Sequence, residues 1–194
     1  MKLFELILGD SLESGVSAIS LVDRPAMESD FIAFSEELEA VRFKTLDEEK
    51  RIVTGLVLIP DKPIMRKGET EPYYVYLSKD TINKTSQMYL MQNKSNNATL
   101  DHAVNVDGVH LVESWIVSDP KNDKTSALGI ESTEGAWAAS MFIQNDDVWN
   151  DYVKTGKVKG FSIEALFKMK PTNIELSMVE FLSELKKAMQ KEHA

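Results

Sequence analysis

The segment Gly160-Phe161-Ser162-Ile163-Glu164-Ala165 lies at the centre of a predicted strand from Val158 to Met169. Earlier in the chain, Thr99-Leu100-Asp101-His102 ends another short strand-like run. A serine hydroxyl can act as a nucleophile, and a histidine can take its proton near neutral pH. The two segments therefore indicate a serine hydrolase site, although most serines and histidines in a domain of this size are structural or solvated.

Outward from this segment, the sequence alternates between short strand-like runs and a few helices. Strands are predicted by β-branched and alternating residues at 16–22, 31–34, 52–59, 73–77, 109–117, 136–143 and 158–169. Helices are predicted at 78–92, 148–153 and 176–191, the first with Ser78 as its N-cap and with Leu90 and Met91 on its apolar side. These elements show no βαβ rhythm. They predict an α+β fold, a mainly antiparallel β-barrel flanked by helices.

The predicted organisation is one barrel domain followed by one helix. The barrel domain covers residues 1–171, with N-terminal strands in 1–34, a charged linker or exposed helix in 35–51, and a long polar loop in 119–135. Pro171 is expected to break the last strand. Residues 172–194 are expected to form an amphipathic helix, either as a scaffold-like extension or as a packing or dimer element.

Composition excludes several classes of protein. The 194 residues carry a net charge of −9, which argues against a nucleic-acid-binding protein. No cysteine is present, so disulfides, thiolate nucleophiles and cysteine zinc sites are excluded. No apolar run reaches the roughly 20 residues that span a bilayer, and the N-terminus lacks the features of a signal peptide. A soluble, intracellular protein without a membrane partner is expected.

Several further motifs surround the serine and the histidine. They are Val112-Glu113-Ser114-Trp115-Ile116-Val117, Gly135-Ala136-Trp137, Asp147-Val148-Trp149 and Lys157-Val158-Lys159. With Gly160–Ala165, these motifs closely resemble the XkdF-type serine proteases of tailed phages, over most of residues 14–170. That family belongs to the prohead proteases, which share a fold with herpesvirus assemblin. The resemblance implies a herpesvirus-protease-like barrel with Ser162 as nucleophile and His102 as general base.

The order of one segment departs from the relatives. In many prohead proteases a segment like Ile19–Ala26 follows the catalytic serine, whereas here it precedes the barrel. The resemblance therefore implies a circular permutation, in which the strand keeps its place in space. In the relatives an acidic residue just before this segment can complete the triad, and the matching position here is Ala18. The third group must then come from elsewhere or be missing.

Glu113 is the preferred third group. It lies on a predicted strand among apolar neighbours, where a carboxylate needs a partner such as an imidazole N–H. His110 is the alternative, because assemblin uses a second histidine. Asp101 is a poor candidate, because adjacent residues of a strand point to opposite faces.

The remaining parts of the site are less defined by sequence. The backbone N–H of Ile163 is a candidate oxyanion donor if strand pairing ends there, and the loop 119–135 is another source. A metal site from Asp101, His102, Asp107 and His110 matches no known ligand spacing, so neither a metal nor another cofactor is expected.

By resemblance, the expected function is a serine endopeptidase of phage capsid maturation. Its partners would be scaffold and major capsid precursor proteins, with self-cleavage, inside the immature capsid in the host bacterial cytoplasm. A homodimer is expected. One alternative is a non-enzymatic capsid or scaffold protein with a degenerate barrel. The other is a non-peptidase serine hydrolase, although the chain lacks a Gly-x-Ser-x-Gly motif.

Overall fold

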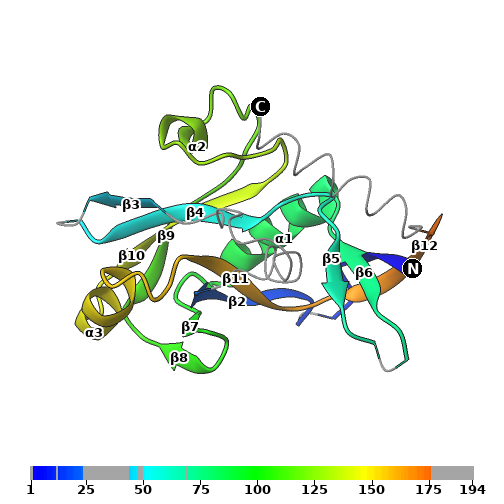
Figure 1. Cartoon of the computed structure of the whole chain (residues 1–194), viewed down its shortest axis with the longest axis horizontal. Helices are drawn as coiled ribbons and strands as arrows, with labels where there is room; N and C mark the ends of the chain where they lie inside the picture. The colour runs from blue at the N-terminus through cyan, green and yellow to red at the C-terminus, as the bar shows by residue number, and fades with distance from the viewer. Residues whose placement is uncertain (1, 12, 24–43, 48–49, 69, 176–194) are drawn as a thin grey trace.

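The computed structural model describes residues 2–11, 13–23, 44–47, 50–68 and 70–175. Within these residues, twelve strands form three four-stranded sheets (Figure 1). The strand predicted at 31–34 and the helix predicted at 176–191 fall outside the described residues.

The three sheets are named here after one strand of each. The β1 sheet has the order β12-β1-β6-β5, with bounds Lys168–Glu175, Lys2–Ile7, Tyr73–Tyr76 and Ile64–Arg66. The β10 sheet has the order β3-β4-β10-β9, with bounds Lys44–Asp47, Ile52–Leu58, Trp137–Ile143 and Val109–Ile116. The β11 sheet has the order β11-β2-β7-β8, with bounds Gly160–Leu166, Gly15–Val22, Ala98–Leu100 and Val104–Val106.

Most ladders are antiparallel, as the sequence pattern predicts. Two neighbours are parallel, β1 with β6 and β2 with β7. The described strands and helices confirm the α+β class, but their ladders form separate sheets and do not close into a barrel. The N-terminal strand β2 lies between β11 and β7, beside the strand that carries Ser162.

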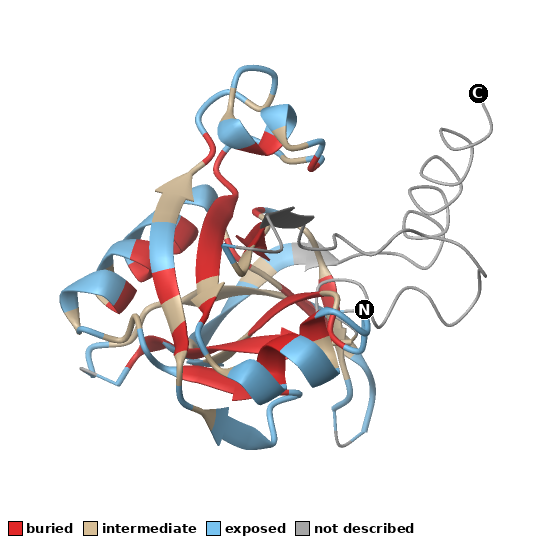
Figure 2. Cartoon of the chain, turned by 90° about the vertical axis from the view of Figure 1, so that its left-hand side faces the viewer, coloured by how far each residue is buried: buried red, intermediate tan, exposed pale blue. Residues whose placement is uncertain are grey.

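The sheets enclose one main apolar core, and buried residues follow its central strands (Figure 2). Ile19, Leu21 and Phe161 contribute to this core from the β11 sheet, and Trp137 contributes from the β10 sheet. Alternation along β2 and β11 sends these side chains inward. It also sends Ser20 and Ser162 to the opposite face of the β11 sheet.

Helix α1 (Lys79–Met91) packs on this core, and the Ser78 side chain caps it by accepting a hydrogen bond from the Thr81 N–H. The predicted helix is therefore confirmed, but its predicted apolar side is wrong. Leu90 and Met91 are exposed, and Ile82 and Tyr89 are among the side chains that bury instead. The cause is that small polar residues of α1 also face the core.

Three local elements differ from the sequence predictions. Strand β3 forms within the segment predicted as a charged linker or helix, because it pairs with the neighbouring strand β4. Helix α2 (Lys124–Ala127) forms within the predicted loop, with the Asp123 side chain capping it. Helix α3 (Asp146–Val148) continues into a π-helical turn over Trp149–Val153, where a helix was predicted.

Pro171 does not end the last strand, as was predicted. It lies inside β12 opposite Phe4 of β1, and the strand continues to Glu175. β12 is an edge strand of the β1 sheet and pairs only with β1. A proline is tolerated on an edge because the ladder does not need an N–H on the open side.

None of the helices in the described part of the chain has the length and apolar character needed to cross a membrane.

Candidate functional site

Ser162 lies on the edge strand β11, directly opposite Ser20 of β2. Only 4% of Ser162 is exposed, and its Oγ has no hydrogen-bond partner. Buried hydroxyls in native proteins are nearly always hydrogen-bonded, and an unpaired one costs free energy. Among the described residues, the Thr85 hydroxyl on α1 is unpaired in the same way, so the position of Ser162 near His102 is what gives its unpaired hydroxyl significance.

His102 lies in the tight turn between β7 and β8. Asp101 and His102 both adopt the left-handed conformation, with φ of 47° and 57°, and the Ala103 N–H bonds the Leu100 carbonyl. This is the pattern of a type I′ turn, whose central positions favour Asn, Asp and Gly. A histidine there is held in a less favourable conformation, and such strain is concentrated at functional sites.

The end of β2 holds the His102 turn in place. The Asp101 N–H donates to the Leu21 carbonyl (3.0 Å), and the Asp101 carboxylate accepts from the Asp23 N–H (3.2 Å). The His102 N–H donates to Ser20 Oγ (3.1 Å). Asp101 therefore anchors the turn and is already engaged by the backbone.

Ser20 connects the two predicted catalytic residues. It is fully buried, it stands opposite Ser162, and its hydroxyl accepts from the His102 backbone and donates to the Thr99 carbonyl (3.3 Å). The structure thus brings Ser162 and His102 to the same part of the β11 sheet. The sequence analysis missed Ser20, although its polar place in an alternating strand was a visible signal.

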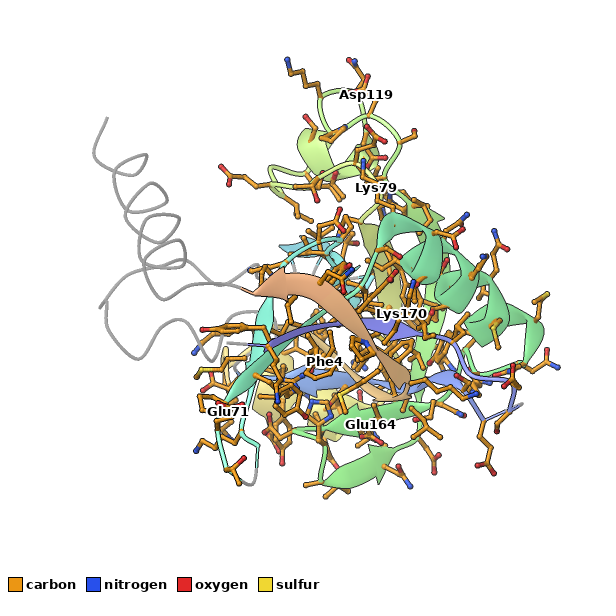
Figure 3. The ribbon with its side chains drawn as sticks, turned by 90° about the vertical axis from the view of Figure 1, so that its right-hand side faces the viewer. Phe4, Glu71, Lys79, Asp119, Glu164 and Lys170 are labelled. Carbon is orange, nitrogen blue, oxygen red and sulfur yellow. The ribbon has the colours of Figure 1, made fainter. Side chains whose placement is uncertain are left out.

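Glu164 is a second residue that the sequence analysis missed. It follows Ser162 by two positions on β11, so both side chains project from the same face. Its Oε1 lies 3.6 Å from His102 Nδ1, and it accepts a hydrogen bond from Thr99 Oγ1 (2.7 Å). Figure 3 labels Glu164 on this part of the molecule. Ser162, Glu164, Ser20, Thr99 and His102 are called the polar face below.

Glu113 lies in the β10 sheet and contacts other partners. Its Oε2 pairs with the Lys124 ammonium and accepts a hydrogen bond from Ser140 Oγ (2.5 Å). These two hydrogen bonds, Lys124 first, lower the pKa of Glu113 below its ordinary value. The structure therefore places Glu113 with Lys124 and Ser140, whereas the carboxylate beside His102 is that of Glu164.

His110 is also engaged away from the polar face. Its Nδ1 lies 2.8 Å from Asn96 Oδ1 and its Nε2 lies 3.3 Å from Gln144 Oε1. Its ring stacks on Phe142. Both ring nitrogens thus have partners in and around the β10 sheet. Among the described residues, no cluster of His, Asp and Glu has the arrangement of a metal site.

The backbone N–H of Ile163 points to the open edge of β11. In an antiparallel ladder, opposite residues either exchange both hydrogen bonds or make none. Ile19, which stands opposite Ile163, donates its N–H to the Asn97 carbonyl on the β7 side (3.1 Å). The Ile19–Ile163 pair is therefore not hydrogen-bonded. Pairing with β2 continues past Ile163, so the donor faces the open edge although the strand does not end there.

A cavity of about 300 Å³ runs along this part of β11. Ser162 and Ile163 line it on one side. Mostly apolar side chains of β5, β6 and neighbouring strands line the rest, together with Arg66 of β5. Its lining includes Ile64, Tyr73, Val75 and Met169. The hydroxyl-bearing strand thus borders an apolar groove, the usual form of a binding site in proteins.

Comparison with known proteins identifies one family. No curated protein and no solved structure matches the chain. One family profile does match, over residues 40–170, and its description is "Putative phage serine protease XkdF". The matched region includes both Ser162 and His102 and more than half of the chain. The chain therefore belongs to the XkdF family of phage serine proteases.

Proposed function

We propose that this protein is a serine endopeptidase that processes scaffold and capsid precursor proteins during phage prohead maturation. The observation that carries the proposal is the orphaned Ser162 hydroxyl, buried beside a strained histidine turn in a protein of this family. A purely structural serine at this position gains nothing from an unsatisfied hydroxyl. A nucleophile gains from having no competing partner.

The proposed acylation step uses Ser162 and His102. Ser162 Oγ attacks the carbonyl carbon of the scissile peptide while its proton passes to His102. The tetrahedral intermediate then collapses, the C–N bond breaks, and His102 returns the proton to the leaving amine. Water, with His102 again as base, hydrolyses the acyl-enzyme. The Ile163 N–H on the open edge of β11 would donate to the oxyanion.

The groove beside β11 supports an extended peptide as substrate. An open strand edge can hydrogen-bond an added strand, and adjacent pockets then select alternate side chains. The apolar lining favours a chain with a large apolar residue near the scissile bond. We expect a segment of this kind in the scaffold and capsid precursors, and the enzyme's own chain is a further expected substrate.

Other parts of the proposal rest on resemblance to prohead proteases. The placement of the N-terminal strand β2 between β11 and β7 supports a circularly permuted relative of these proteases. Assembly as a homodimer and action inside the immature capsid in the host cytoplasm belong to the same proposal. Light scattering of the purified protein would test the dimer.

The central test is labelling with a fluorophosphonate probe. We expect wild type to be labelled at Ser162 and Ser162→Ala to be unlabelled while remaining folded. Wild type should cleave co-expressed scaffold and capsid precursors, and Ser162→Ala should not. Labelling without peptide cleavage would favour a non-peptidase hydrolase, and a folded wild type without labelling would favour a non-enzymatic capsid protein.

A further inference from the structure

We propose that Glu164 is the positioning residue for His102, in the role for which the sequence analysis preferred Glu113. This inference rests on the proposed function, because it concerns the same serine and histidine. It goes beyond that function by naming which carboxylate completes the site. The three observations that carry it are the distance to the imidazole, the anchoring of the carboxylate, and the occupation of the competing groups.

The first observation is the distance between Glu164 and His102. Glu164 Oε1 lies 3.6 Å from His102 Nδ1, within ion-pair range and slightly longer than a hydrogen bond. Hydrogen bonds of catalytic groups are often long before substrate binds and then tighten. A carboxylate at Nδ1 favours the tautomer that carries its proton there. The other nitrogen, Nε2, is then free to accept the proton of a serine hydroxyl.

The second observation is that Glu164 is held in this position. The hydroxyl of Thr99, which is only 3% exposed, donates to the same Oε1 atom at 2.7 Å. The Glu164 backbone carbonyl accepts from Ser17 Oγ at 3.0 Å. The register between β11 and β2 shifts directly after Glu164, because Glu164 pairs with Ala18 and Ala165 pairs with Val16. Ser17 is thus the extra residue of a β-bulge on the partner strand β2. Bulges of this kind are over-represented next to active sites, where they re-aim side chains.

The third observation is that the competing groups have other partners. Glu113 is bound by Lys124 and Ser140. His110 is bound by Asn96 and Gln144. The Asp101 carboxylate accepts from the Asp23 backbone. Among the described residues, Glu164 is thus the acidic group whose carboxylate forms an ion pair with His102.

The charge of Glu164 also matches what the reaction requires. When Ser162 gives up its proton, His102 becomes a cation, and a nearby carboxylate stabilises it. Both Glu164 and His102 are a little over one-third exposed, so neither charge is buried without solvent. The cluster contains one nucleophile, one base and one anion on a single face of the β11 sheet.

The test uses the rate of fluorophosphonate labelling at Ser162, which needs no peptide substrate. We expect Glu164→Gln to slow labelling by about 100-fold or more, because an amide cannot stabilise the imidazolium. Glu164→Asp should recover part of the rate. The matched control, Glu113→Gln, should label within about twofold of wild type.

The outcomes separate this inference from the proposed function. If wild-type Ser162 is not labelled at all, the proposed function fails. If wild type is labelled and Glu164→Gln behaves like wild type, the inference alone is overturned. If Glu164→Gln and Glu164→Asp are equally slow while both remain folded, the carboxylate does not act on His102, and the inference is again overturned. Thermal unfolding of each variant will show whether it is folded.

Discussion

The β11 sheet and the β10 sheet each carry a glutamate beside buried hydroxyls, but the two clusters differ in one respect. In the β10 sheet, Thr54 and Ser140 share a hydrogen bond of 2.8 Å, Ser140 donates to Glu113, and Lys124 neutralises the carboxylate. Every group there has a partner. On the polar face of the β11 sheet, the Ser162 hydroxyl has none.

We interpret this difference as the difference between a structural cluster in the β10 sheet and the proposed reactive cluster in the β11 sheet. A fully satisfied buried network stabilises and specifies the fold. An unsatisfied hydroxyl lowers stability, and native proteins keep such groups where function requires them. Left-handed non-glycine backbone occurs beside both sheets, at His102 and at Arg51, so the unpaired Ser162 hydroxyl alone carries this contrast. The predictions below test the comparison from the larger effect to the smaller.

The largest effect is expected from replacing His102, the proposed base. His102→Gly should lower the labelling and cleavage rates by about 10⁴-fold or more, because Ser162 loses its proton acceptor. The same variant should be at least as stable as wild type, because glycine adopts a φ of 57° without strain. Activity assays and chemical denaturation measure the two quantities.

His110→Ala is the matched control for this variant. This variant removes a histidine of the β10 sheet whose ring nitrogens contact Asn96 and Gln144. We expect the labelling and cleavage rates to stay near those of wild type. Activity lost in His110→Ala and kept in His102→Gly would reverse the assignment of the base.

The second effect compares two serine-to-alanine variants by their free energy of unfolding. Ser140→Ala should destabilise the protein by about 1–3 kcal/mol, because Thr54 and Glu113 both lose a buried partner. Ser162→Ala should not destabilise it, and a gain of about 1 kcal/mol is expected, because the unpaired hydroxyl is removed. Urea denaturation of both variants checks the sign. A large loss of stability in Ser162→Ala would show that its hydroxyl is satisfied in solution.

Local sequence patterns were enough to predict the elements that carry the site. The strands around Ser162 and before His102, the capped helix α1 and the α+β class all follow from periodicity and capping. The prediction that Pro171 ends the last strand was wrong, because only the pairing partners reveal that β12 is an edge strand. The exposure of Leu90 and Met91 likewise depends on which face of α1 the sheets cover.

The third group of the site could not be derived from local pattern. The alternation of apolar and polar residues around Glu113 predicted a carboxylate in need of a partner. The partners that the structure shows are Lys124 of α2 and Ser140 of β10. Glu164 stands directly opposite Ala18 in the ladder between β11 and β2. Opposite residues share a face with Cβ atoms about 5 Å apart, so a carboxylate on either strand can reach the same space. The register between strands that are distant in the sequence decides which carboxylate lies beside His102. One sequence alone does not reveal that register.

The smallest effect concerns the charge of Glu113, which belongs to the fully hydrogen-bonded cluster of the β10 sheet. Hydrogen bonds from Lys124 and Ser140 hold the pKa of Glu113 below its ordinary value of 4.5 in the folded protein. A carboxylate with a depressed pKa adds stability above its unfolded pKa and loses that contribution as pH falls through its folded pKa. The stability lost in Glu113→Gln should therefore be present at pH 7 and shrink as pH falls below about 4.5.

The size of this effect should be small, because nearly half of the Glu113 side chain is exposed and solvent screens its pair with Lys124. We expect a charge contribution below about 1 kcal/mol that decreases further at high salt. Denaturation of wild type and Glu113→Gln at pH 7 and pH 3 measures it. The free energies of unfolding of wild type and Glu113→Gln differ by some amount at each pH. If that difference is the same at both pH values, Ser140 and Lys124 act on Glu113 through hydrogen-bond geometry and not through charge. Unchanged fluorophosphonate labelling in the same variant would keep Glu113 out of the reactive cluster, and the contrast between the two sheets would hold.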